Sequence, residues 1–372
     1  MSSYPSGPPL VSEALFNLLT WVFIIPANAI LTIMGVLSNL ANIIVFVNMT
    51  PIDTMSISFT ALAVSDLIFS IFSVPYLIIN ILIEIGIKDL YNVDLRSLIF
   101  TIFLFQKPLF HKISITIVTF VSVERSLCVM RPFLIKQIFT RRRVTIILAA
   151  IFFSFIIWMM PAMVTVELVW IYPFNRTAPL LVRRTRPEHA LAESIVHLSA
   201  GFPLVLITQV IIAISAVLMA SGLKRHQQFR QAASSASKSA DNKERPVLKN
   251  DKCKSVEKSP TSNPTDEQPS KTSITESSTP TETASNKEQR LIKTVLVLAI
   301  IHVALNFPQL LFYIASFLVP EYRSFKRYNN LYILSSAIIN LFNSVNGMVN
   351  TLVYITLNTR YRVIFNKFFL GK

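Results

Sequence analysis

Residues 56–83 read SISFTALAVSDLIFSIFSVPYLIINILI, an almost unbroken apolar stretch with one charged residue, Asp66. A helix needs roughly 20 apolar residues to cross the hydrocarbon core of a bilayer, so this stretch is long enough to span it. Comparable stretches cover residues 18–47, 98–129, 144–169, 192–222, 291–319 and 330–356. The sequence therefore predicts an all-α membrane protein, a seven-transmembrane helix bundle.

The composition also favours a membrane protein. Hydrophobic residues make up 52% of the 372 residues and charged residues only 15%, whereas about a quarter of the residues in soluble domains are charged. Two cysteines are too few for a disulfide scaffold, and no Cys/His cluster has the spacing of a metal site. A cytosolic enzyme, a zinc protein and a redox protein are therefore all disfavoured.

Basic residues indicate the orientation, because Lys and Arg are retained on the cytoplasmic side of a membrane. Most of the 35 basic residues fall after helix three, between helices five and six, and in the tail. We therefore expect a multi-pass protein of the plasma membrane with residues 1–17 extracellular and no cleavable signal peptide. The sequon at Asn175 then lies outside, where it can be glycosylated.

Two further segments complete the predicted organisation around helices 1–5 (18–222) and helices 6–7 (291–356). Residues 223–290 are rich in Ser, Thr, Lys, Glu and Pro, and such a composition predicts a disordered third cytoplasmic loop. Its hydroxyl groups suit a kinase site and a solvated linker equally well. In residues 357–372 aromatic side chains alternate with Arg and Lys, which predicts a short amphipathic eighth helix and tail on the inner leaflet.

Polar residues inside the spans are costly and usually functional. Asp66 is an isolated acid in the middle of helix two, so it must be paired, hydrated, protonated or bound to a cation. Oxygen-bearing side chains around it could hold a sodium ion or a water cluster, and a purely structural hydrogen-bonded network explains them equally well. Its expected companions are Asn39, Ser114, Asn346 and Asn350.

A second polar group closes helix three, where Glu124 precedes Arg125. The arginine there could simply extend to the lipid headgroups. An acid on another helix would instead make it a switchable contact, and Glu288 at the foot of helix six is such an acid. Breaking that pair would let helix six move.

Six motifs occur in the order and spacing of rhodopsin-like (class A) G-protein-coupled receptors, which the chain resembles over nearly its whole length outside the long loop. The region around Arg125 looks more like invertebrate chemosensory and orphan peptide-type receptors than like amine receptors. The motifs are Gly35-Val36-Leu37-Ser38-Asn39, Leu62-Ala63-Val64-Ser65-Asp66, Glu124-Arg125-Ser126, Pro203, Pro308 and Asn350-Thr351-Leu352-Val353-Tyr354.

The resemblance implies a role for each matching residue. Arg125 would contact a heterotrimeric G-protein once helix six swings out, Glu288 would restrain it at rest, and Tyr354 would join the activated core. The Asp66 network would bind sodium, the one cofactor implied. The other partners implied are an extracellular ligand, membrane lipids, and kinase and arrestin at the third cytoplasmic loop; no nucleic acid is expected.

The chain also departs from the family's pattern. Phe100 stands where the family has a cysteine that bonds the second outer loop, so this loop must be ordered without a disulfide. Asn306 replaces a tryptophan, His302 an aromatic residue and Thr351 a proline. These departures predict that the protein signals through altered contacts or signals poorly.

The expected ligand cavity contains Lys107, which lies five helical turns outward from Arg125, with His111 one turn deeper and Asn306 on helix six. A lysine would repel a cationic ligand, so we expect an anionic small molecule or a peptide with an acidic group. Alternatively, Lys107 and Lys112 pair with internal acids or reach water.

Other seven-helix functions are less consistent with the sequence. A retinal photoreceptor needs a lysine where this chain has Ser344. A transporter or channel is the stronger rival, because Asp66 and Lys107 could serve a transport path, but inverted repeats are not apparent. No nucleophile, base and orienting acid recur at useful spacing, so an enzyme is not expected.

Overall fold

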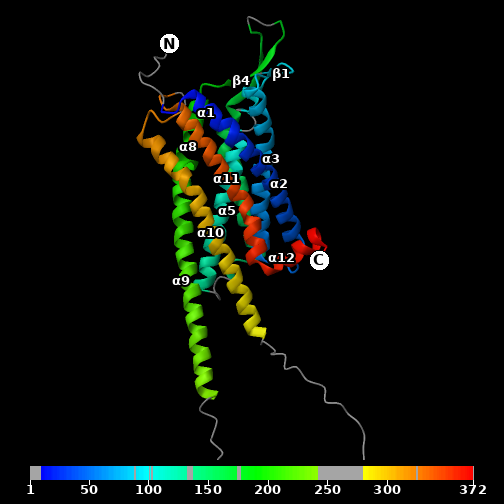
Figure 1. Cartoon of the computed structure of the whole chain (residues 1–372), viewed down its shortest axis with the longest axis vertical. Coiled ribbons are helices and arrows are strands. Elements are labelled where there is room, and N and C mark those ends of the chain that lie inside the picture. Colours follow the sequence, from blue (N-terminus) through cyan, green and yellow to red (C-terminus); the bar gives the residue numbers. More distant parts are fainter. Residues whose placement is uncertain are drawn as a thin grey trace, which may run out of the picture.

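A computed structural model describes residues 10–87, 89–99, 101, 104–131, 137–173, 177–241, 280–323 and 326–371. Long helices run side by side in a bundle, with α1 (Glu13–Leu19) near one end and α12 (Thr359–Phe365) near the other (Figure 1). The long helices are α2 (Ile25–Val47), α3 (Thr54–Glu84), α5 (Leu104–Met130), α7 (Arg141–Val164), α9 (Phe202–Asp241), α10 (Pro280–Leu318) and α11 (Asn329–Leu357).

Shorter elements cap the two ends of the bundle. One end carries a small sheet and is called the hairpin end below; the other carries α12 and is called the α12 end (Figure 1). The short helices are α1 (Glu13–Leu19), η1 (Thr20–Ile24), α4 (Leu95–Leu98), α8 (His189–Ala200), α12 (Thr359–Phe365) and η3 (Asn366–Leu370), and the strands are β1 (Asp89–Leu90), β2 (Val93–Asp94), β3 (Val166–Ile171) and β4 (Leu180–Thr185).

Six of the described helices are long and apolar enough to cross a membrane. The seventh, α11, has 29 residues and packs against α2 and α10. It is more polar because its Asn, Ser and Thr side chains, including Asn343, Asn346 and Asn350, are buried inside the bundle. The predicted seven-helix membrane bundle is confirmed, and its most polar member lies where polar groups can hydrogen-bond one another rather than meet lipid.

A four-stranded sheet is the main difference from the expected all-α fold. The stretch 144–169 is not one helix: α7 ends at Val164, and residues 166–171 form β3, paired antiparallel with β4. Alternation and the β-branched and aromatic residues of VELVWI favour a strand. The strand order is β1-β2-β4-β3, and the Leu181 N–H donates to the Asn92 carbonyl at 2.8 Å. Backbone pairing therefore orders this loop where a disulfide is lacking.

Two helices continue into the segment expected to be a loop. α9 extends to Asp241 and α10 begins at Pro280, so helix occupies residues 223–241 and 280–290, and residues 242–279 lie outside the description. Alanine, lysine, glutamine and arginine are good helix formers, so the helix persists where apolarity stops. Near its other end α9 is separated from α8 at Gly201, because Pro203 has no backbone N–H to continue the ladder.

The helices α5 and α9 approach closely at Gly222, where an added Cβ would lie 1.9 Å from Val129 Cγ1. Gly222→Ala is therefore expected to destabilise the protein by about 1–3 kcal/mol through overpacking. The thermal unfolding midpoint in detergent measures this. Combining it with Val129→Ala should recover most of the loss, and an equally unstable double variant would contradict the packing argument.

Candidate functional site

Asp66 is buried in the middle of α3 and receives hydrogen bonds from two other helices. Ser114 Oγ on α5 donates to Oδ1 at 2.6 Å, and Asn350 Nδ2 on α11 donates to Oδ2 at 3.0 Å. Ser65 Oγ lies 2.8 Å from Ser114 Oγ, and Gly347 lies against the carboxylate, with an ideal Cβ 3.5 Å from Cγ. Three helices thus converge on one carboxylate, as the sequence predicted for Ser114 and Asn350.

The other two expected companions make different contacts. Asn39 Nδ2 donates to the Gly347 carbonyl at 3.1 Å, which places it one step from Asp66. Asn346 Nδ2 lies 3.0 Å from His302 Nδ1 on α10 and has no hydrogen bond to Asp66. The network therefore has a part centred on Asp66 and a second part centred on His302.

The network also reaches the α12 end through Asn42. Its Oδ1 accepts hydrogen bonds from Thr351 Oγ1 at 3.0 Å and from the Tyr361 hydroxyl at 2.7 Å, while its Nδ2 lies 3.4 Å from Asn39 Oδ1. Burial raises the pKa of the Tyr361 hydroxyl above its usual range, so it stays a donor. α12 is thereby fastened to the same polar core as Asp66.

Lys107, which was expected to face the ligand cavity, is buried beside two aromatic rings. Lys107 Nζ lies 5.1 Å from the ring centroid of Phe69 and 5.2 Å from that of Tyr76. Within the described residues it has no ion pair, so the predicted alternative of an internal acid is not what the structure shows. His111, one turn deeper, lies with Nε2 3.4 Å from Gln309 Oε1 on α10.

His302 and Asn306 carry the departures from the family's pattern in α10. Asn306 Nδ2 donates to the His302 carbonyl at 2.9 Å. Because Asn346 donates to His302 Nδ1, the assigned tautomer carries its proton on Nε2. Both His302 Nε2 and Asn306 Oδ1 are buried without a hydrogen-bond partner among the described residues. A water molecule or a rearrangement of the neighbouring side chains can supply the missing hydrogen bonds to these two atoms.

Some of the basic residues at the hairpin end have an acidic or a neutral hydrogen-bond partner. Arg186 Nε donates to Glu167 Oε1 in an exposed pair, and this hydrogen bond lowers the pKa of the Glu167 carboxyl. Arg183 Nη2 lies 2.9 Å from His189 Nε2. Arg176 and the sequon residue Asn175 lie outside the described residues.

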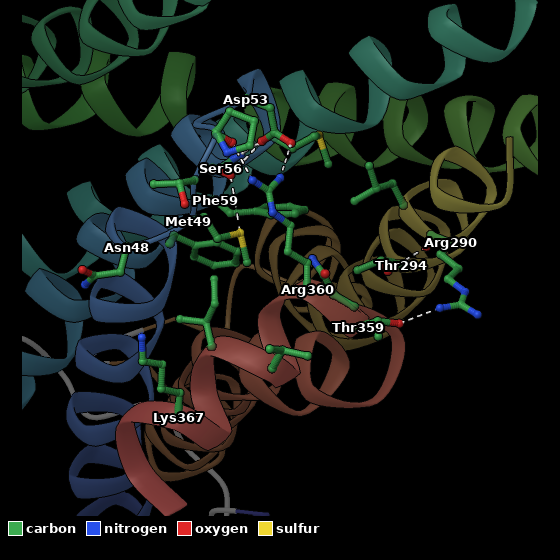
Figure 2. Close-up of a pocket in the computed structure, with 18 of the residues that line it drawn as sticks. Asn48, Met49, Asp53, Ser56, Phe59, Arg290, Thr294, Thr359, Arg360 and Lys367 are labelled. Carbon is green, nitrogen blue, oxygen red and sulfur yellow. Dashed lines mark hydrogen bonds and ion pairs between the residues drawn. The ribbon is translucent and has the colours of Figure 1, made fainter. Parts of the chain in front are cut away.

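At the α12 end the turn between α2 and α3 is tied to α12. Arg360 donates to Asp53 Oδ2 at 3.3 Å and to the Pro51 carbonyl at 2.6 Å. The other oxygen of Asp53 caps α3 by accepting from the Ser56 N–H at 2.8 Å. Figure 2 shows these contacts beside a second tie, in which Arg290 Nη1 of α10 donates to Thr359 Oγ1 at 2.7 Å.

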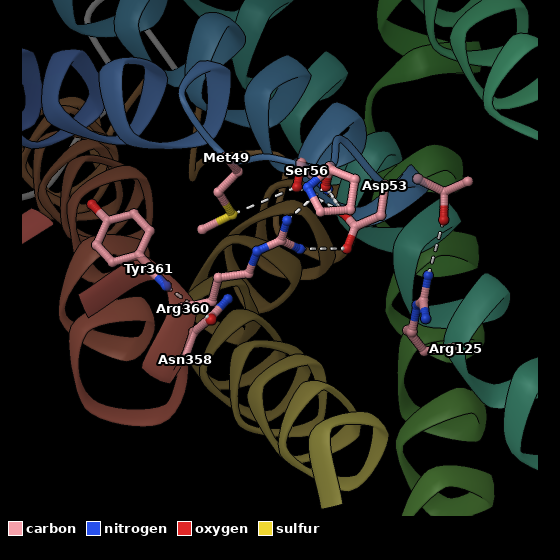
Figure 3. A network of polar contacts seen from close by, with 9 residues as sticks. Met49, Asp53, Ser56, Arg125, Asn358, Arg360 and Tyr361 are labelled. Carbon is pink, nitrogen blue, oxygen red and sulfur yellow. Dashed lines mark hydrogen bonds and ion pairs between the residues drawn. The ribbon is translucent and has the colours of Figure 1, made fainter. Parts of the chain in front are cut away.

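Arg125 lies close to this turn, nine-tenths buried at the end of α5. Its Nη2 donates to Glu124 Oε1 at 2.9 Å and to Thr54 Oγ1 of α3 at 3.3 Å, the second contact being drawn in Figure 3. Thr54 Oγ1 lies 3.1 Å from the same Glu124 oxygen. The side chain of Glu288 is outside the described part of α10, so its expected contact with Arg125 stays a prediction.

Tyr354 lies in an aromatic cluster with rings from α2, α3 and α12. Its ring centroid is 5.0 Å from that of Phe46, 4.8 Å from that of Phe59 and 5.5 Å from that of Tyr361. Its hydroxyl is buried with no hydrogen-bond partner in the part of the chain that is described. An unsatisfied buried hydroxyl costs free energy, so a state in which it finds a partner would relieve that cost.

Sequence reasoning did not single out Asp53, Arg290, Thr359 or Arg360. Asp53 had a signal, because an aspartate directly before an apolar helical stretch is a common N-cap. The ties of Arg290 and Arg360 join segments far apart in the sequence, which spacing within one helix does not reveal.

One of two comparisons with known proteins identifies a family. A search of curated protein sequences gave no significant match. The family described as "7 transmembrane receptor (rhodopsin family)" matches residues 38–354, which include the helices that carry Asn39, Asp66, Arg125 and Tyr354. The chain therefore belongs to the rhodopsin family of seven-transmembrane receptors.

Proposed function

We propose that this receptor passes an extracellular chemical signal to a heterotrimeric G-protein, with its N-terminus outside the plasma membrane. Arg125 carries the proposal. At the α12 end its guanidinium is hydrogen-bonded to Glu124 and Thr54, and it can give up these contacts to bind a G-protein. Such a receptor works by shifting an equilibrium between two states, each with its own set of contacts.

Ligand-free nucleotide exchange on a panel of G-proteins tests this function without knowledge of the ligand. Membranes carrying the wild-type chain should stimulate exchange above membranes from untransfected cells. Glu288→Ala should raise it further, because the predicted restraint on α10 is lost. A transporter would be favoured by two results together. Neither chain would stimulate exchange at equal surface expression, and the membranes would show solute flux.

The ligand is proposed to bear a carboxylate or another anion that meets Lys107. The lysine is buried beside Phe69 and Tyr76 and lacks an acidic partner among the described residues. Burying an unpaired cation is costly, so an incoming anion would gain a charge-assisted hydrogen bond there. His111 and Asn306 are proposed to line the same cavity.

Lys107→Ala is expected to lower the potency of an anionic agonist about 10–100-fold, the loss of one hydrogen bond to a charged group. A library of carboxylates and acidic peptides, screened by nucleotide exchange, supplies the agonist. Lys112→Ala is the matched control, since it removes a second buried lysine from the same helix. Equal losses in both variants would mean that the lysines act through folding.

Sodium is proposed as a ligand of the Asp66 site. The donor set fits, because Asp66 supplies carboxylate oxygens and Ser114 and Ser65 supply hydroxyl oxygens within one hydrogen-bonded group. Carboxylate and hydroxyl oxygens suit a small hard cation. Asn350 would orient the carboxylate through its amide.

Three finer features are proposed from the sequence. They are glycosylation at Asn175, regulation by kinase and arrestin within residues 223–290, and a relationship to invertebrate chemosensory receptors.

A further inference from the structure

A cleft of about 940 Å³ opens at the α12 end between the turn after α2, the start of α10, and α12 with η3 (Figure 2). This volume is typical of sites that bind small molecules. Its floor is apolar and its rim is polar and basic. The apolar lining comprises Phe46, Met49, Met55, Phe59, Leu291, Val363, Ile364 and Phe368.

The rim of the cleft carries more positive than negative charge. Arg360 is compensated by Asp53, as described above. Among the described residues, Arg290 is bonded to the neutral hydroxyl of Thr359 and to no acid, and Lys367 is exposed and likewise has no acidic partner. Two cations are therefore available at the mouth, on different sides of the cleft (Figure 2).

The apolar lining continues onto the outer face of α12 and η3. Val363 and Phe368 line the cleft, yet 62% and 51% of their surfaces are exposed, as are 46% of Phe369 and 59% of Leu370. A short helix with exposed apolar residues and basic neighbours lies in the interface of a membrane. The cleft therefore adjoins an apolar face that suits the leaflet, and a lipid of that leaflet would reach it along these side chains.

We propose that this cleft binds an anionic phospholipid of the adjoining leaflet, its headgroup at the basic rim and an acyl chain along the apolar floor. A phosphate at Arg290 would compete with Thr359 for the guanidinium, because hydrogen bonds between charged groups are stronger than those to neutral oxygens. Occupancy would therefore loosen the tie between α10 and α12. The proposal does not depend on the signalling function.

Photo-crosslinking in nanodiscs tests it. The receptor is reconstituted in phosphatidylcholine doped with phosphatidylserine that carries a diazirine on one acyl chain, and labelled peptides are identified by mass spectrometry. Labels are expected on the segments around Met49, Met55 and Leu291. Arg290→Gln combined with Lys367→Gln should reduce them about tenfold, because the two basic residues that would attract an anionic headgroup are lost and salt screens part of that attraction.

Two variants make the test specific. Arg141→Gln with Arg142→Gln removes the same charge from exposed positions at the start of α7 and should leave labelling unchanged. Val363→Trp keeps the charges but fills the apolar lining, and should reduce labelling.

Three results would overturn the proposal. They are equal labelling by a phosphatidylcholine probe, equal losses in the two charge variants, and labelling only by a short-chain anionic amphiphile added from solution. The assay contains no G-protein, so its outcome is separate from the outcome of nucleotide exchange.

Discussion

Replacing Arg125 with alanine is expected to reduce G-protein nucleotide exchange to the level of control membranes. In the structure the guanidinium is held by Glu124 and Thr54, and in the signalling state we expect it to bind the partner. Losing hydrogen bonds to a charged group costs about 1.5–3 kcal/mol each, enough for a loss of 10–100-fold per bond. The measurement is exchange at matched receptor density.

Removing the arginine also leaves the Glu124 carboxylate buried without its cation, which destabilises the chain. A variant that is expected to raise exchange separates a signalling effect from a folding defect. Glu124→Gln weakens the hold on Arg125 and should raise ligand-free exchange, a result that a folding defect cannot produce. Arg141→Ala, at an exposed position of the same end, should leave exchange unchanged. Normal exchange by a well-folded Arg125→Ala variant would exclude the proposed coupling role.

Replacing Asp66 with alanine is expected to have the second largest effect, a loss of stability. The Ser114 hydroxyl and the Asn350 amide would both lose their hydrogen bond to the carboxylate in a buried site, at about 1–3 kcal/mol for each. Its thermal unfolding midpoint in detergent should therefore fall well below that of the wild-type chain. Asp66→Asn, which keeps an oxygen and the shape, should retain more of the stability.

The same position tests the sodium proposal. Ligand-free exchange by the wild-type receptor should fall in NaCl relative to KCl at equal ionic strength, and Asp66→Asn should abolish that difference. Asp53→Asn is a matched control, because it neutralises an acid at the α12 end and should keep the sodium effect. A wild-type receptor that is indifferent to the cation would leave Asp66 as a purely structural group.

The long apolar runs made the helices predictable, because a span must satisfy its backbone hydrogen bonds internally. The strand β3 was missed, since residues 166–169 continue a largely apolar run and hydropathy does not distinguish a strand from the end of a helix. Both helix ends inside the long loop were missed for the opposite reason, because a helix outside lipid needs good helix formers rather than apolar residues.

The polar network was predictable in part. Asn346 and Asn350 are one helical turn apart, so both face the same side of α11 and both were expected to reach Asp66. Asn350 meets Asp66, whereas Asn346 meets His302. Which partner each asparagine meets depends on how α11 is placed relative to α3 and α10. The spacing of residues within one helix does not reveal that placement.

The pairing of β2 with β4 has a practical consequence. The sheet at the hairpin end is joined by backbone hydrogen bonds and holds no cysteine. Its formation therefore needs neither an oxidant nor a disulfide isomerase. Cell-free synthesis into nanodiscs under reducing conditions is therefore a suitable route to this receptor, and thiol reagents can remain in every buffer during its purification.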